Sequence, residues 1–313
     1  MKKHKICKIL LVILAILLCV AFYELLGICI AYKKQPEVSN TTKKETKNGS
    51  WNECSENTER AVIIEKNPEA LLQRVRLIQN AKEEIILSTF AFKSDESGKL
   101  ILGALHDAAD RGVHIRLLVD GMESWIDMEG NPYFYGLSSH ENVEIKLYNK
   151  ANPLKPWKMM GRMHDKYLIA DGKTYILGGR NTYNYFLGDF PGHKNYDRDV
   201  LVVCNEPEKE NSVNQLLDYF ETIWDQEDSG YFHNNKKLAN RKSVKNAVLE
   251  LQNGYQKYFE ENKERICDTD YTDETFETEK IALVSNPIHT GSKEPVVWYQ
   301  LGELMKNAKN RVK

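Results

Sequence analysis

A histidine, a lysine and an asparagine in the middle of the chain stand at a spacing that suits phosphate chemistry. His164, Lys166, Asp171, Gly178 and Asn181 fit the pattern H-x-K-x(4)-D-x(6)-G-x(2)-N. Side chains alternate between the faces of a β-strand, so His164 and Lys166 are expected to point the same way. Neutral imidazole has a free lone pair, and an ammonium group neutralises a phosphate oxygen. The spacing therefore predicts a site that holds a phosphate and attacks its phosphorus.

Each of these residues also has an ordinary structural role open to it. A lone His164 would more often be a core histidine bonded to a backbone carbonyl, and Lys166 a solvent-facing lysine. Their shared face favours the functional interpretation. Asn181 is expected to donate a hydrogen bond to the phosphate, although it also suits a turn. Gly178 and Gly179 lack bulk, which lets the backbone pass close to the phosphate.

The attacking histidine also needs a carboxylate that orients its second ring nitrogen. Asp197 and Asp199 are the candidates, because both are expected on one face of an otherwise apolar strand. Asp197 is preferred of the two. Asp171 keeps its place among the candidate catalytic residues with His164 and Lys166. However, it precedes a glycine in a predicted turn, where aspartate is favoured for backbone reasons, so a structural role is expected for it.

The elements around the motif predict how it is positioned. The motif itself is expected on two short strands joined by a turn at residues 171–173. Upstream, apolar runs alternate with segments whose apolar residues recur at helical spacing. This alternation predicts an α/β domain with a largely parallel or mixed sheet. The expected elements are strand 61–64, helix 68–81, strand 84–92, helix 97–112, strand 113–120, helix 132–139, strand 143–148, strand 197–204 and a helix around 216–224.

The five-position pattern resembles the signature of the phospholipase D superfamily, in particular its bacterial cardiolipin-synthase-like branch. The resemblance extends to the predicted β-α-β run at 84–121, to 178–181 and to 196–201, and it covers roughly residues 61–228. It implies a phospholipase D-like α-β-α sandwich with a mixed sheet. In that family the domain usually occurs as two tandem repeats, so this chain is expected to carry the first of them behind one transmembrane helix.

The resemblance also implies a mechanism and a set of residue roles. His164 would attack a phosphodiester and form a phosphohistidine, while Lys166, Asn181 and Gly179 would hold the phosphate. A second histidine, supplied by the second repeat in that family, would protonate the departing alcohol and deprotonate the incoming one. No metal or cofactor is implied. With one motif in this chain, the site is expected to be completed by a homodimer or by a missing C-terminal half.

The first thirty residues are expected to be a membrane anchor. Four lysines precede the run from Ile9 to Tyr32, whose only charged residue is Glu24. That run is long enough to cross a bilayer, which takes about 20 apolar residues. A cleaved signal peptide is the alternative, but the run is long for one and no clear cleavage site follows. The larger lysine cluster precedes the run, which favours a single-pass protein in the cell membrane with its globular part extracytoplasmic.

The remaining organisation follows from composition and from one internal similarity. Residues 304–312 resemble residues 77–85, which lead into the first core strand, so the chain is expected to end within a second repeat and to be truncated. Cys54 and Cys267 lie in polar segments and would pair if the domain is extracytoplasmic; two free thiols are the alternative. The expected parts are an anchor at 1–32, a flexible stalk at 33–60, a phospholipase D-like domain at 61–230, a helical connector at 231–280 and the start of the second repeat at 281–313.

These features together favour a membrane-anchored phosphatidyltransferase of the cardiolipin synthase type, with phosphatidylglycerol as substrate. A phospholipase D that transfers to water would use the same site. A phosphodiesterase acting on nucleic acid would need a basic groove, whereas the formal net charge is -2 and the pI is near 6.5, so no nucleic-acid partner is expected. The alternative outside enzymes is an inactive half-site that serves as an interaction module.

Overall fold

A computed structural model describes residues 2–49, 59–206, 211–233 and 235–309. The chain divides into two compact units, which are described separately. The smaller consists of Met1–Asn48, Ala151–Arg162 and Val284–Lys313, and the larger of Gly49–Lys150 and Met163–Leu283. The motif lies wholly in the larger unit.

The larger unit is built on one mixed sheet of nine strands in the order β8-β4-β3-β2-β5-β6-β7-β1-β9. β2, β3 and β4 are parallel to one another, and the other pairs are antiparallel. The predicted α/β fold with a mixed sheet is therefore confirmed. The strands are β1 (Glu59–Ile64), β2 (Glu84–Thr89), β3 (His114–Asp120), β4 (Val143–Tyr148), β5 (Lys166–Ala170), β6 (Thr174–Gly178), β7 (Asp199–Cys204), β8 (Ser229–Tyr231) and β9 (Phe276–Glu277).

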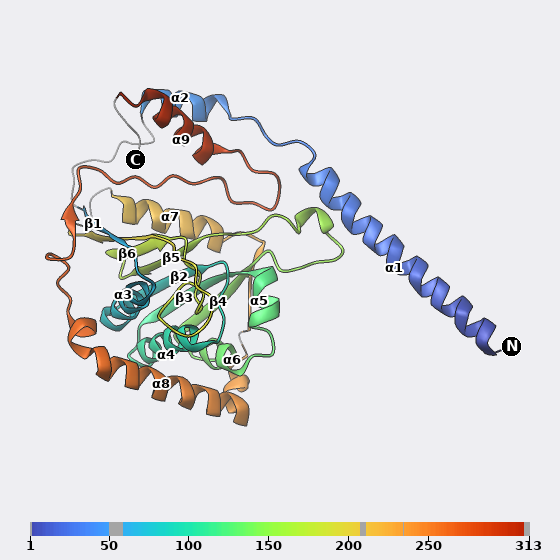
Figure 1. The fold of residues 1–313 in the computed structure, drawn as a ribbon, viewed down its shortest axis with the longest axis horizontal. Coiled ribbons are helices and arrows are strands. Elements are labelled where there is room, and N and C mark those ends of the chain that lie inside the picture. The colour runs from blue at the N-terminus through green and yellow to red at the C-terminus, as the bar shows by residue number, and fades with distance from the viewer. Residues whose placement is uncertain (1, 50–58, 207–210, 234, 310–313) are drawn as a thin grey trace. The chain divides into compact units, whose positions relative to one another are not determined.

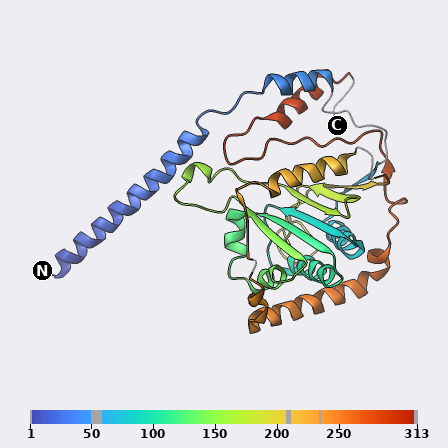
Figure 2. The same cartoon turned by 180° about the vertical axis from the view of Figure 1, so that it is seen from behind.

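Helices cover both faces of this sheet. Figures 1 and 2 show, from opposite sides, α7 on one face and α3, α4, α6 and α8 on the other. This arrangement is the predicted α-β-α sandwich. A short helix, α5, follows β3 directly. The helices are α3 (Asn67–Asn80), α4 (Glu96–Asp110), α5 (Gly121–Asp127), α6 (Pro132–Ser138), α7 (Ser212–Trp224) and α8 (Lys242–Cys267).

The motif hairpin forms where the sequence predicts it. β5 and β6 pair antiparallel, with Tyr167 opposite Leu177 and Ala170 opposite Thr174. Asp171 begins the turn with a φ of 51° and Gly172 follows with a φ of 60°, a left-handed region that aspartate and glycine tolerate best. β5 is buried along its whole length between β2 and β6. The sheet therefore fixes the motif at the centre of the domain.

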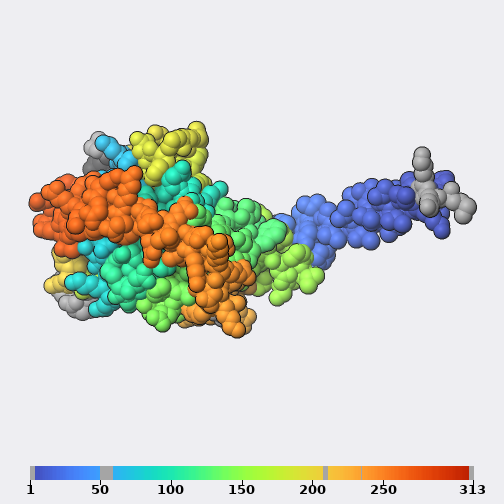
Figure 3. Space-filling view, turned by 90° about the horizontal axis from the view of Figure 1, so that it is seen from below, coloured from blue at the N-terminus to red at the C-terminus, as the bar shows by residue number. Residues whose placement is uncertain are grey.

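The segment predicted as a helical connector contains α8, which packs on the domain. Val244, Ala247, Leu251 and Tyr255 recur at helical spacing and are buried, and burial of Val244 and Leu251 contributes on the order of 1.5–3 kcal/mol each. In the space-filling view of Figure 3, the orange surface of α8 lies across the helical face of the domain. The polar residues that suggest an exposed helix in the sequence form only its outer side.

The smaller unit contains the apolar N-terminal helix, α1 (Lys2–Tyr32). Its span His4–Tyr32 has a mean hydropathy of 2.9 in its most apolar window, long and apolar enough to cross a membrane. A signal sequence near the N-terminus would meet the same criteria. Only one such helix occurs among the described residues. The assignment of α1 as a membrane anchor therefore rests on its length and composition.

The region predicted as a flexible stalk contains a helix, α2 (Asn40–Asn48). Ser39 caps its start by accepting a hydrogen bond from the Thr42 backbone N–H at 3.1 Å. Glu294 accepts from the Ser39 backbone N–H and the Thr42 hydroxyl at 2.8 and 2.7 Å. Glu294 precedes α9 (Val296–Asn307) in the sequence. Capping and a partner distant in sequence therefore stabilise a polar segment whose composition alone suggests disorder.

The structure describes the cysteines of the larger unit only in part. Cys204 is a buried free thiol in β7. Cys54 lies outside the described residues, so its pairing with Cys267 remains a prediction.

Candidate active site

The motif begins at the edge of the sheet where the parallel strands end. β2 ends at Thr89, which lies opposite Lys166, the first residue of β5. β3, on the other side of β2, ends at Asp120. Ligands of open α/β sheets bind beyond the carboxyl ends of the parallel strands. Phe90, Asp120 and His164 come together at this edge because the strands stop there.

His164 and Lys166 both lie close to one aromatic ring, that of Phe90. The His164 ring centroid is 4.6 Å from that of Phe90, and the Lys166 Nζ is 5.4 Å from it. The Lys166 ammonium donates a hydrogen bond to the His164 carbonyl oxygen at 2.6 Å. His164 is exposed, whereas Lys166 is 6% exposed. His164 precedes the strand, so the lysine contact, as well as the pleat, sets its position.

The electrostatics of this pair suit a nucleophile beside a cation. Burial lowers the pKa of His164 and the Lys166 charge lowers it further, while Asp120 acts in the opposite direction. The imidazole is therefore neutral at neutral pH and keeps its lone pair. Burial lowers the pKa of Lys166 to about 8, opposed by the charges of Asp165 and Asp197. The lysine remains largely charged at neutral pH but is close to losing its proton.

Asp120 is a site residue that sequence reasoning did not select. Its carboxylate is fully buried, with one oxygen accepting from the backbone N–H groups of Met122 and Glu123 at 3.1 and 3.3 Å. The other oxygen accepts from the Met163 backbone N–H at 3.1 Å. Asp120 therefore starts α5 and also fixes the residue that precedes His164. A charged residue at the end of an apolar strand was the available signal.

Asp165 lies between His164 and Lys166 in the sequence. Its side chain is on the opposite face of the sheet, toward α7. Its carboxylate accepts a hydrogen bond from the Tyr219 hydroxyl of α7 at 2.8 Å. The Tyr219 ring packs edge-on against Tyr167, with centroids 6.4 Å apart. Burial and the Asp165 charge raise the pKa of Tyr219 well above its usual range, so the hydroxyl stays a donor. Because side chains alternate along the strand, Asp165 binds the motif to α7 on one face of the sheet, and Lys166 lies on the other face.

Asn181 and Gly179, the two residues predicted to hold a phosphate with Lys166, follow β6 and contact neighbouring parts of the chain. The Asn181 side-chain oxygen accepts from the Ala91 backbone N–H at 3.2 Å, which leaves its amide nitrogen as a donor. A Cβ atom on Gly179 would lie 2.1 Å from an Asp197 carboxylate oxygen. A larger residue at this position would require the Asp197 carboxylate to move, because the three nearest atoms all belong to that side chain. Asp197 lies before β7, which begins at Asp199, later than the predicted strand start.

Asp199 lies in a buried ion cluster. Its carboxylate contacts the guanidinium groups of Arg74 and Arg180 at 2.9 and 3.2 Å. Arg180 also donates to the backbone carbonyls of Ile64 and Glu65 at 3.1 and 2.7 Å. This cluster ties β7 to α3 and to the end of β1. Of the acids considered, Asp120 is the one whose charge acts on His164, whereas Asp199 is engaged by arginines.

Asp171 lies at the far end of β5 from His164, roughly 20 Å away at the rise of an extended strand. One carboxylate oxygen accepts from the backbone N–H groups of Glu83 and Glu84 at 2.8 and 3.0 Å, and the other accepts from Lys82 N–H at 2.9 Å. The carboxylate therefore ties the hairpin turn to the start of β2. This placement matches the structural role expected from the turn and separates Asp171 from the chemistry.

Among the described residues, no group of three or more His, Cys, Asp or Glu side chains is placed to hold a metal ion. The polar groups at the site are instead one neutral imidazole, one ammonium and one amide donor. Together they can bind an oxyanion and present a nitrogen lone pair to it.

Comparison with known proteins identifies a phospholipase D-like domain in this chain. Residues 74–224 match the family described as cardiolipin synthase, PLD-like domain. An uncharacterised protein of Helicobacter pylori strain J99 is 30% identical over 63% of this chain and 39% of its own length. Cardiolipin synthase C of Escherichia coli K12 is 29% identical over 45% of this chain and 31% of its own length.

Among solved structures, the chain is similar to phosphatidylserine synthase from Haemophilus influenzae, at 15% identity and a TM-score of 0.47 over 79% of this chain and 52% of that one. The chain spans less than two fifths of the length of the two curated relatives named above.

Proposed function

We propose that this chain, whose phospholipase D-like domain is of the cardiolipin-synthase-like kind, contributes a phosphatidyltransferase site acting on phospholipid phosphodiesters. One observation carries the proposal. A neutral, exposed imidazole and a largely buried ammonium contact the same Phe90 ring at the open edge of the sheet.

In the first step, a ring nitrogen of His164 attacks the phosphorus of phosphatidylglycerol. A P–N bond forms, the P–O bond to glycerol breaks, and a second histidine gives its proton to the departing glycerol oxygen. Lys166 and the Asn181 amide hold the non-bridging oxygens while charge builds up in the five-coordinate transition state. Asp120 favours the charge that His164 acquires when it is phosphorylated.

In the second step, the hydroxyl of another phosphatidylglycerol attacks the phosphohistidine. The second histidine, now neutral, accepts the hydroxyl proton, a new P–O bond forms, and the P–N bond breaks. The products are cardiolipin and a regenerated His164. With water in place of the lipid hydroxyl, the same step would release phosphatidic acid, which is the hydrolase alternative.

The second histidine must come from outside the described motif. We place it either in a second copy of this chain or in a following repeat. One sequence parallel supports the repeat, at the C-terminal ends of α3 and α9, which are capped by Ala81 and Ala308. Each helix closes on an asparagine and an alanine, and in α3 this end leads into β2.

The apolar helix supports placement at a membrane. As a single-pass anchor, α1 would hold the domain beside a substrate that is confined to two dimensions. We propose that the N-terminus lies inside and the globular part outside, because Lys2, Lys3, Lys5 and Lys8 precede the span.

A lipid assay tests the proposal directly. The full chain, reconstituted in vesicles of phosphatidylglycerol, should form cardiolipin and release glycerol, and His164→Ala should not. His193→Ala, at an exposed histidine whose ring lies beside Tyr185, is the matched control and should retain the activity of the unchanged chain. Mixing experiments with a chain carrying a second motif test the need for a partner site.

Three results would redirect the assignment. Phosphatidic acid without cardiolipin would identify a hydrolase, and cleavage of DNA without any lipid product would identify a nuclease. Absence of every product, both alone and with the partner half, would leave an interaction module.

A further inference from the structure

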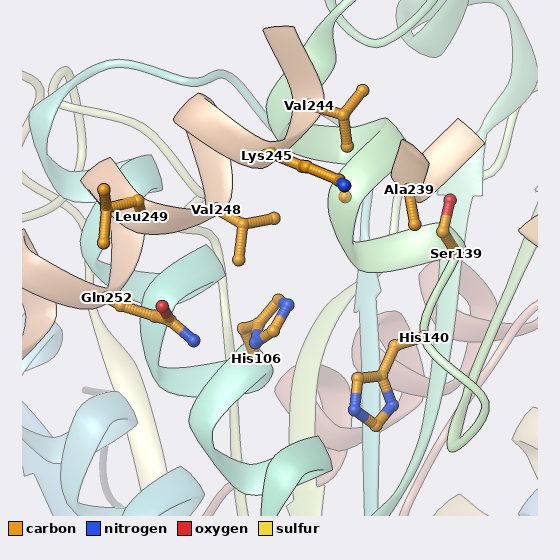
Figure 4. Close-up of a pocket in the computed structure, with 10 residues that line it drawn as sticks. His106, Ser139, His140, Ala239, Val244, Lys245, Val248, Leu249 and Gln252 are labelled. Carbon is orange, nitrogen blue, oxygen red and sulfur yellow. The ribbon is translucent and has the colours of Figure 1, made fainter. Parts of the chain in front are cut away.

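A cavity of 290 Å³ lies between α4, α6, α8 and the short helix η3 (Lys236–Asn240). It belongs to the helical layer, away from the sheet edge that carries His164. A water-sized group takes up about 30 Å³ of liquid volume, so the cavity has room for a small organic molecule. Figure 4 shows Val244, Lys245 and Val248 on its α8 side and the two histidine rings opposite.

One carboxylate organises the histidine side of this cavity. The Asp110 oxygens contact His106 Nδ1 at 3.1 Å and His140 Nε2 at 3.2 Å. His140 Nδ1 accepts from the Asn142 backbone N–H at 3.1 Å, so its Nε2 carries the proton that reaches Asp110. Both His140 nitrogens are thereby engaged, and this residue is a structural part of the wall.

His106 differs from His140 in one respect. Its side chain is 9% exposed, its Nδ1 contacts Asp110, and no described residue forms a hydrogen bond with its Nε2. The ring lines the cavity. This nitrogen is open to the cavity, where water or a ligand can meet it. With Asp110 accepting a hydrogen bond from Nδ1, a ring that carries a proton on both nitrogens presents Nε2 as a donor to an anionic group.

The rest of the lining combines aliphatic side chains with the polar residues Ser139 and Gln252 and with a cation at the rim. Val244, Val248, Leu249 and Ala239 supply apolar surface. Lys245 is exposed, and no described side chain forms an ion pair with it. The cavity stays open beside a close helix contact, because a Cβ on Gly136 would lie 2.6 Å from a methyl group of Val248. An apolar wall between a buried imidazole and a lysine fits a short aliphatic chain with an anionic head.

We propose that this cavity binds a small anionic amphiphile, with His106 Nε2 and the Lys245 ammonium at its head group and the α8 valines along its chain. A carboxylate head and a phosphate monoester head share this chemistry. The site is separate from the motif and does not depend on the reaction proposed for His164.

Calorimetry on the full chain in nanodiscs tests the site, with empty nanodiscs as the blank. The probes are hexanoate and hexyl phosphate, which distinguish the two head groups, and hexanol, which has the same chain without a charge. We expect one or both anions to bind with a Kd of about 1 mM or tighter and hexanol to bind at least about tenfold more weakly.

Four variants locate the binding. His106→Asn keeps a donor for Asp110 but removes the Nε2, and should weaken the anion about tenfold or more. Lys245→Gln should weaken it about threefold, the effect of an exposed ion pair. Ala239→Leu, at an exposed wall position, should abolish binding by filling the mouth. Lys242→Gln, on the same helix outside the cavity, is the matched control and should change nothing.

Activity at His164 should be unchanged in all four variants. The proposal is overturned if neither anion binds the unchanged chain, if hexanol binds as tightly as hexanoate, or if Ala239→Leu binds the probes as the unchanged chain does.

Discussion

Strand β5 presents the two ends of one motif in different states. At its start, the Lys166 ammonium is largely buried beside an exposed imidazole, and a backbone carbonyl is its one hydrogen-bond partner among the described residues. Just past its end, the Asp171 carboxylate accepts hydrogen bonds from three backbone N–H groups. The contrast teaches that position in a motif does not define a role. The chemical end is the one whose polar groups remain free to bind a ligand. The structural end is the one whose polar groups are engaged by the protein itself.

The largest expected effect is at the chemical end. His164→Ala removes the atom that attacks phosphorus, so transfer should fall by a factor of about 10⁴ or more. The thermal midpoint of the domain should stay within a few degrees, because the side chain is exposed. Product analysis and a thermal melt measure the two quantities. Retained transfer would contradict this comparison, because the imidazole would then take no part in the reaction.

Lys166→Met is expected to come next. The change keeps the length of the side chain but removes the charge that holds a phosphate oxygen, so transfer should fall about 10²–10³-fold. The free energy of unfolding should rise, because a buried cation is replaced by an apolar chain. Rates at saturating lipid, together with chemical denaturation, test both signs. A loss of stability would indicate that the ammonium supports the fold.

Raising the pH should act on activity and on stability in opposite directions. Burial lowers the pKa of Lys166 from 10.5 to about 8, so the unfolded chain binds this proton more tightly than the folded chain. The free energy of unfolding should therefore rise as pH increases from about 8 toward 10.5. Transfer should fall over the same range as the lysine loses its charge. Lys166→Met provides the control, because its stability should show no such rise.

At the structural end, Asp171→Ala should mainly affect stability. Three backbone N–H groups at the start of β2 lose their acceptor, with a cost of about 1–3 kcal/mol in the free energy of unfolding. Transfer by the folded fraction should change less than about tenfold. Denaturation and rates per folded molecule separate the two. A transfer loss as large as that of His164→Ala would place Asp171 with the chemistry.

The smallest expected effect concerns Tyr219, on the face of the sheet opposite Lys166. Tyr219→Phe removes one hydrogen bond to Asp165, which stabilises the motif by about 0.5–1.5 kcal/mol. The pKa of Lys166 should change little, because the Asp165 charge remains. Transfer should fall about threefold at all pH values, whereas Asp165→Asn should also shift the alkaline limb of the pH profile downward. Identical profiles for the two variants would contradict this division of roles.

Much of the fold could be predicted from local sequence. The hairpin, the parallel β2-β3-β4 run and α3, α4 and α6 follow from apolar periodicity and turn residues. α2 was missed because its partner, Glu294, is 255 residues from Ser39. The inner side of α8 was missed because its polar residues dominate the composition. In both places, tertiary contacts decide what local propensity leaves open.

The site could be predicted where chemistry lies within one hairpin and not where it depends on distant contacts. His164 and Lys166 are neighbours on the chain, so their proximity follows from the strand. Asp120 is 43 residues from Met163, and Asp199 is 125 residues from Arg74. Both acids enter apolar strands and look alike in sequence. Only the packed structure shows that one lies beside the histidine and the other beside arginines.

The hydrogen bond from Lys166 to the His164 carbonyl has a consequence for encounter with a ligand. A lysine side chain on a surface rotates about four bonds, and restraining it takes up to about 2 kcal/mol of conformational entropy. Here one of its three N–H groups is already fixed within the chain, so that entropy is lost during folding. The two remaining N–H groups are therefore oriented in advance, and an arriving oxyanion meets a rigid receptor.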